Sequence, residues 1–379
     1  MDFNITCSSN SSILGGDNFN GSFPCSNGTV VPTNASSLVG GGSAPLEIKG
    51  ATKYLCYLFY SLVFLFGVGG NMIVFYVIGY RKKKRAGSDV YILSLALADL
   101  LASAFIPVVM LNDLISDFSK WYYGKAMCYV FPVITPTTMV VSAWSLVLIS
   151  LDRYRVILKP MAPKPSAVTL YCSVISIWVV SICINIPYLL RIEFVNNMCW
   201  DSSSHYIKPK EFIIYAGFWV FFIWGIPNII MIVVYCLTGA ALKRNTLKHA
   251  NSKAMEQRNK QNRNIVKMFA IIVIIFFLLT MPYALFYFAG SYLILYDPMP
   301  DVKLIYTWNY LLFFLASANG CINPLIYAKM HRDVNGFLRS VATRLSGCCR
   351  STSSQARNEM YKPSSNLSVS TTRTEQSTM

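Results

Sequence analysis

Seven long apolar blocks, separated by short polar segments, dominate the chain. A helix that crosses a hydrocarbon core of roughly 30 Å needs about 20 residues, and each block reaches that length with few charges inside. A strand of a membrane barrel would span about ten residues and would alternate apolar and polar positions. The pattern therefore predicts an all-α membrane protein, a seven-transmembrane helix bundle, over residues 54–80, 88–116, 126–156, 167–190, 210–242, 264–292 and 303–328.

The composition agrees with lipid as the main solvent. Hydrophobic residues make up 54% of the 379 residues and charged residues 13%, whereas about a quarter of a soluble domain is charged. The 11 cysteines form no Cys-x-x-Cys pair and have no histidine cluster beside them, so a zinc or redox site is not favoured.

The positive charges predict how the bundle is oriented. The net charge is +16, and 25 of the 33 lysines and arginines lie on one side of the predicted bundle, at or beyond the ends of the first, third, fifth and seventh blocks and at the start of the sixth. Because basic residues gather on the cytoplasmic side, we expect a multi-pass protein of the plasma membrane with its N-terminus outside. The charge is therefore a topology signal, and a nucleic-acid partner is not favoured.

Three regions follow from this arrangement. Residues 1–49 form a polar extracellular segment, expected to be disordered and to lack a cleaved signal peptide. Residues 50–345 form the transmembrane domain, and residues 346–379 form a Ser/Thr-rich cytoplasmic tail. Five Asn-x-Ser/Thr sequons in the first region predict glycosylation at Asn4, Asn10, Asn20, Asn27 and Asn34.

An amphipathic stretch follows the seventh block. From Asp333 to Leu345, Phe337, Leu338 and Val341 share one face, which predicts a short helix lying on the inner leaflet in contact with membrane lipid. The adjacent Cys348 and Cys349 are candidates for palmitoylation.

Two motifs are specific enough to carry a family resemblance. The third block ends in Asp152-Arg153-Tyr154, and the seventh ends in Asn323-Pro324-Leu325-Ile326-Tyr327. Over roughly residues 50–350 the chain resembles the rhodopsin-like (class A) G-protein-coupled receptors, and among them the neuropeptide receptors. Further matches occur in the expected order at Gly70, Asn71, Asp99, Trp178, Pro227, Tyr235, Phe276 and Pro282.

The resemblance implies a switch for a heterotrimeric G protein. Asp152, Arg153 and Tyr154 form its centre, and Tyr235 and Tyr327 close on Arg153 when the sixth helix swings outward. Met161, in the loop that follows, is expected to enter a pocket on the G protein. The alternative is that Arg153 only snorkels to the membrane surface. The tail implies an arrestin-like partner after phosphorylation.

The chain departs from the family pattern at two positions. Many relatives have an acidic residue on the sixth helix that holds the arginine, and Asn262 stands there. The family usually has a tryptophan two residues before the proline of the sixth helix, and Thr280 takes its place. Phe276 is then the better candidate for the moving core residue, and the alternative is that it is an ordinary core residue.

Two further sites are implied by the resemblance. Asp99, Ser142, Asn319 and Asn323 supply the oxygen groups that surround a bound sodium ion in this family, which suits a hard cation. The alternative is a protonated, hydrogen-bonded structural Asp99. No other cofactor is expected. Cys128 and Cys199 match the family's outer disulfide, while pairing of Cys7 with Cys25 remains open.

The ligand is expected to be an extracellular peptide. Amine receptors have an aspartate where this chain has Thr135, and opsins need a lysine inside the seventh helix, where only Lys303 occurs, at the outer end. Acidic residues surround the expected mouth, and aromatic and polar residues line it: Thr135, Met139, Tyr283, Phe286, Asn309 and Phe313. A receptor for a non-peptide small molecule, or a transporter or channel, is the alternative. The sequence contains no motif that predicts an enzyme.

Overall fold

A computed structural model describes residues 50–82, 87–117, 119–159, 163, 165–190, 192–201, 209–248, 253–296 and 302–344. Within these residues, seven helices are long and apolar enough to cross a membrane: Ala51–Arg81, Gly87–Ser116, Gly124–Leu158, Ala167–Leu189, Ile213–Arg244, Asn259–Leu293 and Thr307–Met330. The predicted seven-helix bundle is confirmed.

The spans are built from the following elements. The first four are α1 (Ala51–Val74) continued by the π-helix η1 (Phe75–Arg81), α2 (Gly87–Ser116), α3 (Gly124–Leu158) and α4 (Ala167–Leu189). A hairpin of β1 (Ile192–Val195) and β2 (Met198–Asp201) follows. The remaining spans are α5 (Pro209–Val220), η2 (Phe221–Gly225) and α6 (Ile226–Lys248), then α7 (Lys253–Tyr296), then α8 (Val302–Ser317) and α9 (Asn319–Met330). Residues 332–344 are also helical.

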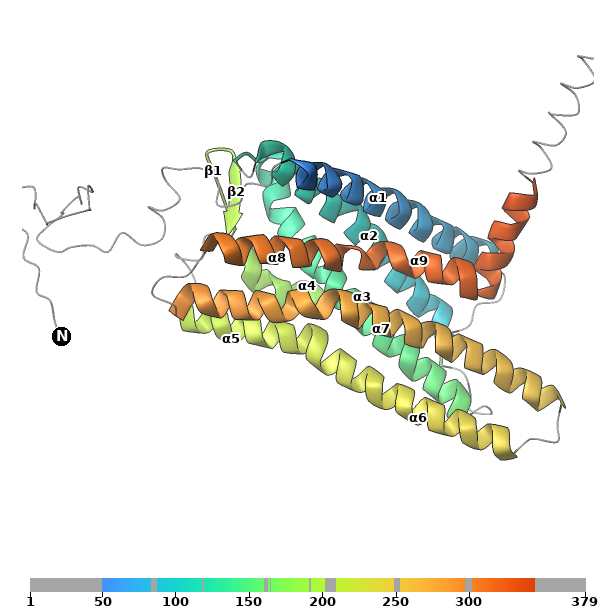
Figure 1. The fold of residues 1–379 in the computed structure, drawn as a ribbon. Helices are drawn as coiled ribbons and strands as arrows, with labels where there is room; N and C mark the ends of the chain where they lie inside the picture. Colours follow the sequence, from blue (N-terminus) through green and yellow to red (C-terminus); the bar gives the residue numbers. More distant parts are fainter. Residues whose placement is uncertain are drawn as a thin grey trace, which may run out of the picture.

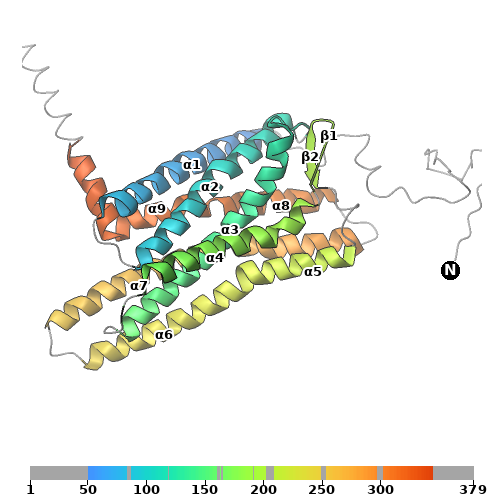
Figure 2. The same ribbon diagram turned by 180° about the vertical axis from the view of Figure 1, so that it is seen from behind.

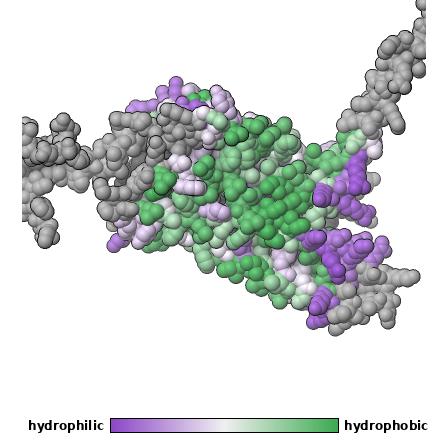
Figure 3. All heavy atoms as spheres, in the orientation of Figure 1, coloured by the Kyte–Doolittle hydropathy of each residue, from purple (hydrophilic) through white to green (hydrophobic). Residues whose placement is uncertain are grey.

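The helices lie lengthwise beside one another, and the two ends of the bundle differ (Figures 1 and 2). The β1–β2 hairpin lies at one end, called here the hairpin end. The 332–344 helix lies at the other, called the arginine end because α3 brings Arg153 there. In Figure 3 the middle of the visible face is hydrophobic, and hydrophilic side chains gather at the arginine end. Such an apolar belt is what a bundle surrounded by lipid requires.

Several helices are longer than their apolar blocks. The sixth block was predicted over 264–292, whereas α7 begins at Lys253 and ends at Tyr296. The fifth was predicted to end at residue 242, whereas α6 continues to Lys248. Hydrophobicity marks the part of a helix that lies in lipid, and helical bonding continues into the polar flanks. The fifth and seventh blocks are also interrupted, by η2 and by a break at Ala318.

Small residues bring α1 close to its neighbours. A Cβ atom on Gly67 would lie 2.2 Å from Ser103 Oγ of α2, and one on Gly70 would lie 2.6 Å from Pro324 Cβ of α9. Only glycine allows both approaches. Asn71 uses the close approach of α1 to α9 to donate to the Gly320 carbonyl over 2.9 Å.

The hairpin was not predicted as strands. β1 and β2 pair in an antiparallel register that places Phe194 opposite Cys199. The turn residues Asn196 and Asn197 have φ values of 53° and 59°, a conformation that asparagine tolerates better than most residues. The Asn197 carbonyl accepts a 2.8 Å bond from the Trp121 backbone N–H, so the turn is fixed against the segment that precedes α3.

Candidate functional site

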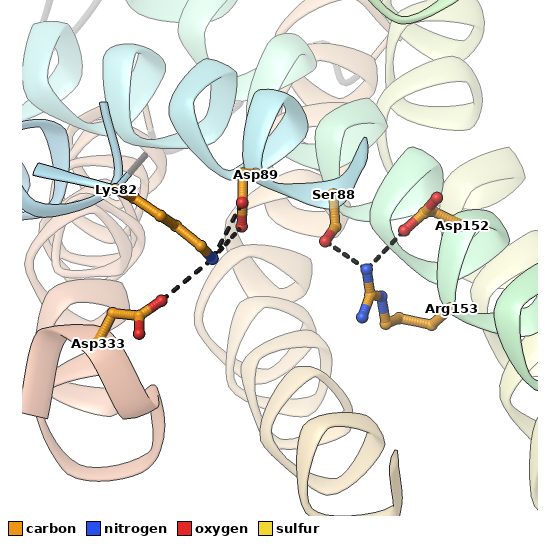
Figure 4. A network of polar contacts seen from close by, with 6 residues as sticks. All are labelled: Lys82, Ser88, Asp89, Asp152, Arg153 and Asp333. Carbon is orange, nitrogen blue, oxygen red and sulfur yellow. Dashed lines mark hydrogen bonds and ion pairs between the residues drawn. The ribbon is translucent and has the colours of Figure 1, made fainter. Parts of the chain in front are cut away.

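Arg153 lies near the last turns of α3 and is held by two oxygen atoms (Figure 4). Its guanidinium donates to Asp152 over 2.7 Å and to the hydroxyl of Ser88 at the start of α2. Asp152 is buried, so this is a charge-assisted bond shielded from water. The arginine is therefore tied back onto α3 and α2.

The two tyrosines expected to close on Arg153 are not bonded to it. The hydroxyls of Tyr235 on α6 and Tyr327 on α9 are buried, and neither has a hydrogen-bond partner among the described residues. Arg153 Nε is also buried and has no hydrogen-bond partner among the described residues. A buried polar atom without a partner costs free energy, so all three atoms would gain from a new contact. Tyr154 is half-buried, and Met161 lies outside the described residues.

Asn262 leaves Arg153 without an acidic partner on α7. The Asn262 side chain is half-buried, and within the described part of the chain no hydrogen bond or ion pair joins it to Arg153. Ser88, which sequence reasoning missed, contacts the arginine instead. Serine at the start of a helix gave no signal of this contact, because it depends on how α2 packs beside α3.

The four residues of the predicted sodium site come together only in part. Asp99 is buried on α2, where it accepts from Ser142 of α3 over 3.1 Å and from Asn323 of α9 over 2.6 Å. Asn319 lies one turn before Asn323. Its side-chain oxygen is buried and has no hydrogen-bond partner among the described residues. A carboxylate, a hydroxyl and an unused amide oxygen suit a hard monovalent cation.

A disulfide joins Cys128 on α3 to Cys199 on β2, as predicted. Cys128 is fully buried within a small apolar cluster that also contains Trp121, Phe131 and Ile192. The bond and the cluster together fix the hairpin over the end of the bundle. Five cysteines that lie within helices are free: Cys56, Cys172, Cys183, Cys236 and Cys321.

A chain of aromatic rings crosses the bundle on the hairpin side of Pro282. Tyr283 of α7 packs against Phe313 of α8, with ring centroids 5.1 Å apart, and against Tyr287 at 6.1 Å. Trp219 of α5 continues the chain to Tyr287 at 5.5 Å and to Trp224 of η2 at 5.0 Å. Of these five residues the sequence predicted only Tyr283 and Phe313. The others were hidden because a tryptophan or tyrosine in an apolar block does not reveal which way it faces.

The other four predicted ligand residues are more scattered. Met139 packs against the main core cluster, and the Thr135 carbonyl accepts from Thr138 over 2.8 Å. Phe286 and Asn309 are half-buried. Within the described residues neither makes a ring contact or side-chain hydrogen bond with Tyr283 or Phe313. The structure therefore gathers two of the six predicted residues directly.

Thr280, where the family usually has tryptophan, is committed to its own helix. Its buried hydroxyl donates to the Phe276 carbonyl over 2.7 Å. Phe276 itself is buried in the core, as expected for a core residue. The large indoles of this region come instead from Trp219 and Trp224, and Trp224 is 1% exposed.

The predicted modification sites cannot be placed. The sequons at Asn4, Asn10, Asn20, Asn27 and Asn34 and the cysteines Cys348 and Cys349 lie outside the described residues. The predicted amphipathic stretch after the seventh span is helical over residues 332–344. Its Val334 is buried, and Phe337 and Leu338 pack against the core.

Comparison with known proteins identifies the class. The sequence profile of the family described as "7 transmembrane receptor (rhodopsin family)" matches residues 70–327, which is more than half of the chain. The chain therefore belongs to the rhodopsin family of seven-transmembrane receptors, which are not enzymes.

Individual relatives are receptors named for peptides. The chain is 28% identical to Neuropeptide receptor 22 of Caenorhabditis elegans, covering 74% of this chain and 68% of the relative. It is 26% identical to Tachykinin-like peptides receptor 86C of Drosophila melanogaster, covering 80% and 61%. It is 28% identical to the Substance-K receptor of Homo sapiens, covering 73% and 70%.

Proposed function

We propose that this chain is a receptor that binds an extracellular peptide at the hairpin end and activates a heterotrimeric G protein at the arginine end. The relatives named above are peptide receptors, which supports the ligand class. The contact that carries the proposal is the pairing of Arg153 with Asp152 and Ser88. It holds a cationic group that helix movement can release.

Two buried tyrosines can accept Arg153 once it is released. Tyr235 and Tyr327 have hydroxyls without partners among the described residues, and they lie on α6 and α9. If α6 and α7 move away from α3, Arg153 can exchange Ser88 and Asp152 for these hydroxyls. The bonds that the buried hydroxyls gain in the second state offset part of the free energy lost when Ser88 and Asp152 release Arg153, which narrows the difference between the two states. A ligand with a modest preference can then select between them.

The aromatic chain is the proposed floor of the peptide site. It connects α5, α7 and α8, and among these α7 is a helix that the switch requires to move. Aromatic walls suit the side chains of a peptide. At the rim, Asp117 is paired with Lys53 over 2.5 Å, so this acid is neutralised by the protein itself. A non-peptide small molecule is the alternative ligand.

The orientation and location belong to the proposal. We place the N-terminus outside the cell and the arginine end in the cytoplasm, at the plasma membrane. Support comes from the basic residues, 25 of 33 of which flank the arginine end in sequence. The disulfide at the hairpin end requires an oxidising compartment, which agrees with an extracellular position.

A sodium ion is the proposed occupant of the site around Asp99. The residues fit the ion because Asn319 offers a buried oxygen that nothing else uses among the described residues. When bound, the ion supplies a positive charge that neutralises the Asp99 carboxylate. Ser142, Asn319 and Asn323 would orient toward it. The direct bond from Asn323 to Asp99 would then belong to the receptor without the ion.

Membrane lipid and an arrestin-like protein are the proposed further partners. The 332–344 helix is amphipathic, with Val334 buried and Arg339 exposed, which suits the inner leaflet. The Ser/Thr-rich residues after 350 supply hydroxyls for phosphorylation, which would add the clustered negative charge that such a partner recognises.

One experiment tests the central proposal. Membranes containing the chain and a promiscuous G protein are exposed to pools of amidated and unamidated peptides, and nucleotide exchange is measured. We expect at least one pool to stimulate exchange in the unaltered receptor and none to do so in Arg153→Ala. Ion or solute flux without G protein, in place of exchange, would contradict the proposal and favour a channel or transporter.

A further inference from the structure

Lys82 joins two elements whose contacting residues, Asp89 and Asp333, are 244 positions apart in the chain (Figure 4). Its ammonium lies 3.0 Å from Asp89 at the start of α2 and 3.1 Å from Asp333 at the start of the 332–344 helix. Lys82 follows η1 directly. The end of η1, the start of α2 and the start of the 332–344 helix therefore meet at one cation.

The two acids are in different surroundings. The Asp89 side chain is 3% exposed, and that of Asp333 is 40% exposed. Burial lowers the pKa of Lys82, but its hydrogen bonds to Asp89 and Asp333 outweigh this effect and leave that pKa raised. The lysine therefore stays charged at neutral pH. A carboxylate as buried as Asp89 needs such a cation, because an uncompensated buried charge is strongly destabilising.

Ser88, which contacts Arg153, and Asp89, which contacts Lys82, are consecutive in the chain. Ser88 accepts from Arg153, and Asp89 accepts from Lys82, so the first turn of α2 is bonded on both sides (Figure 4). Gly87, at the start of the same turn, leaves room for Asp152, because a Cβ atom there would lie 3.3 Å from the Asp152 Oδ1. The position of this turn therefore sets whether Ser88 reaches Arg153.

The 332–344 helix is itself firmly fixed. Asn335 donates to the Ala328 carbonyl over 2.7 Å, which bonds the helix to the end of α9. The Arg81 guanidinium lies 5.2 Å from the centre of the Phe337 ring, within the range of a cation–π contact. Asp333 is thus a fixed point, and Lys82 transmits its position to α2.

We propose that Lys82 is a positioning residue for the G-protein switch: by bridging Asp333 and Asp89 it keeps Ser88 on Arg153 and so holds the receptor at rest. This bridge takes over the role of the acidic residue that many relatives have on the sixth helix, at the position where this chain has Asn262. The inference rests on the proposed function. It also makes the 332–344 helix a control point, because anything that draws Asp333 away weakens the hold on Arg153.

The test is a double-mutant cycle in basal nucleotide exchange. Lys82→Gln should raise basal exchange roughly two- to fivefold, the range expected for one partly exposed ion pair. Ser88→Ala should raise it similarly, and Lys82→Gln should add little in the Ser88→Ala background because both act through one bond. Lys82→Arg keeps the charge and should remain near the unaltered receptor.

A matched control removes a lysine from the same end without touching the bridge. Lys329 is exposed at the end of α9, and Lys329→Gln should leave basal exchange unchanged. Hydrogen exchange of the backbone in residues 87–92, compared between Lys82→Gln and Lys329→Gln, should rise only in the first variant. A general loss of folding would instead raise backbone hydrogen exchange throughout the bundle and lower the amount of receptor.

The outcomes distinguish a failure of this inference from a failure of the proposed function. Independent, multiplicative effects of Lys82→Gln and Ser88→Ala would overturn the inference, as would equal basal exchange in Lys82→Gln and Lys329→Gln. An unaltered receptor that supports no nucleotide exchange would overturn the proposed function, and this inference with it. An active receptor in which only the cycle fails would overturn the inference alone.

Discussion

Trp219 on α5 donates its indole N–H to the side-chain oxygen of Asn185 on α4 over 3.0 Å, and both side chains are buried. The Asn185 amide donates in turn to the Ser181 carbonyl over 2.7 Å. Both the oxygen and the nitrogen of this amide are therefore hydrogen-bonded inside an apolar span, and the oxygen orients one indole of the proposed peptide site.

Trp219→Phe should lower the thermal stability of the purified receptor. The substitution leaves the Asn185 oxygen buried without its donor, which costs about 1–3 kcal/mol, and it should weaken peptide binding by displacing the aromatic chain. Melting temperature and peptide affinity are the measurements. Trp308→Phe on α8 is the control, since Trp308 is 48% exposed. Equal melting temperatures for both variants would contradict this reading of the bond.

Breaking the disulfide should abolish peptide binding or delivery to the cell surface. Cys128→Ser and Cys199→Ser each release the hairpin from α3, and the proposed site then loses its cover. Surface labelling and peptide binding measure the two effects separately. Cys236→Ser, at an exposed free cysteine of α6, should leave both unchanged. Normal surface level and affinity in the two disulfide variants would show that the bond is dispensable.

Sodium should lower agonist affinity. The ion favours the packing around Asp99 in the resting state while agonist favours the other, so the two are negatively coupled. Asp99→Asn removes the charge that the ion neutralises and should remove the salt effect. Affinity is measured in sodium and in a large organic cation at equal ionic strength. An unchanged sodium effect in Asp99→Asn would count against this site.

Asn262→Glu should lower basal nucleotide exchange. A carboxylate at this position of α7 would give Arg153 the acidic partner that many relatives have, and it would hold α7 against α3. Because one partly exposed ion pair is worth up to about 1 kcal/mol, the decrease should be a few-fold. Asn262→Gln, which adds length without charge, is the control. Equal basal exchange in both variants would rule out this route to the arginine.

Stability should fall on the acid side because of His331. Burial lowers the pKa of this imidazole; Asp333 and Asp89 raise it, and Lys82 and Arg153 lower it further. The folded receptor therefore binds fewer protons than the unfolded chain below about pH 6.5, the ordinary histidine value, so stability decreases as pH falls through that range.

His331→Asn should flatten this part of the profile. The comparison of melting temperature between pH 7.5 and pH 5.5 isolates the histidine, because all other titrating groups are shared with the unaltered receptor. A profile that is as steep in His331→Asn as in the unaltered receptor would assign the acid sensitivity elsewhere.

The spans were predictable because lipid imposes length and hydrophobicity on them. The π-helices η1 and η2 were not predictable, since in a segment that is apolar on all sides a change of helical period leaves no trace in the pattern. The hairpin was missed because Ile192–Asp201 is short and its pairing depends on the disulfide and on Trp121.

The sequence predicted those residues of the site that belong to the family motifs. Asp99, Ser142, Asn323, Arg153 and the two bonded cysteines were predicted by resemblance. Ser88 and Asp333 were not predicted as partners of the switch, because nothing in the chain near either residue indicates what lies opposite. Their roles depend on how three helix ends meet, which packing determines and local sequence does not.

The continuity of α7 gives the receptor a mechanical property. This helix is unbroken from Lys253 to Tyr296, and Pro282 lies inside it, visible as the long orange helix of Figure 1. At 1.5 Å per residue, the arm from Pro282 to Lys253 is about 43 Å long and the arm to Tyr296 about 21 Å. If α7 pivots at this proline, it acts as a lever of unequal arms, and a displacement of its hairpin end becomes roughly twice as large at its arginine end.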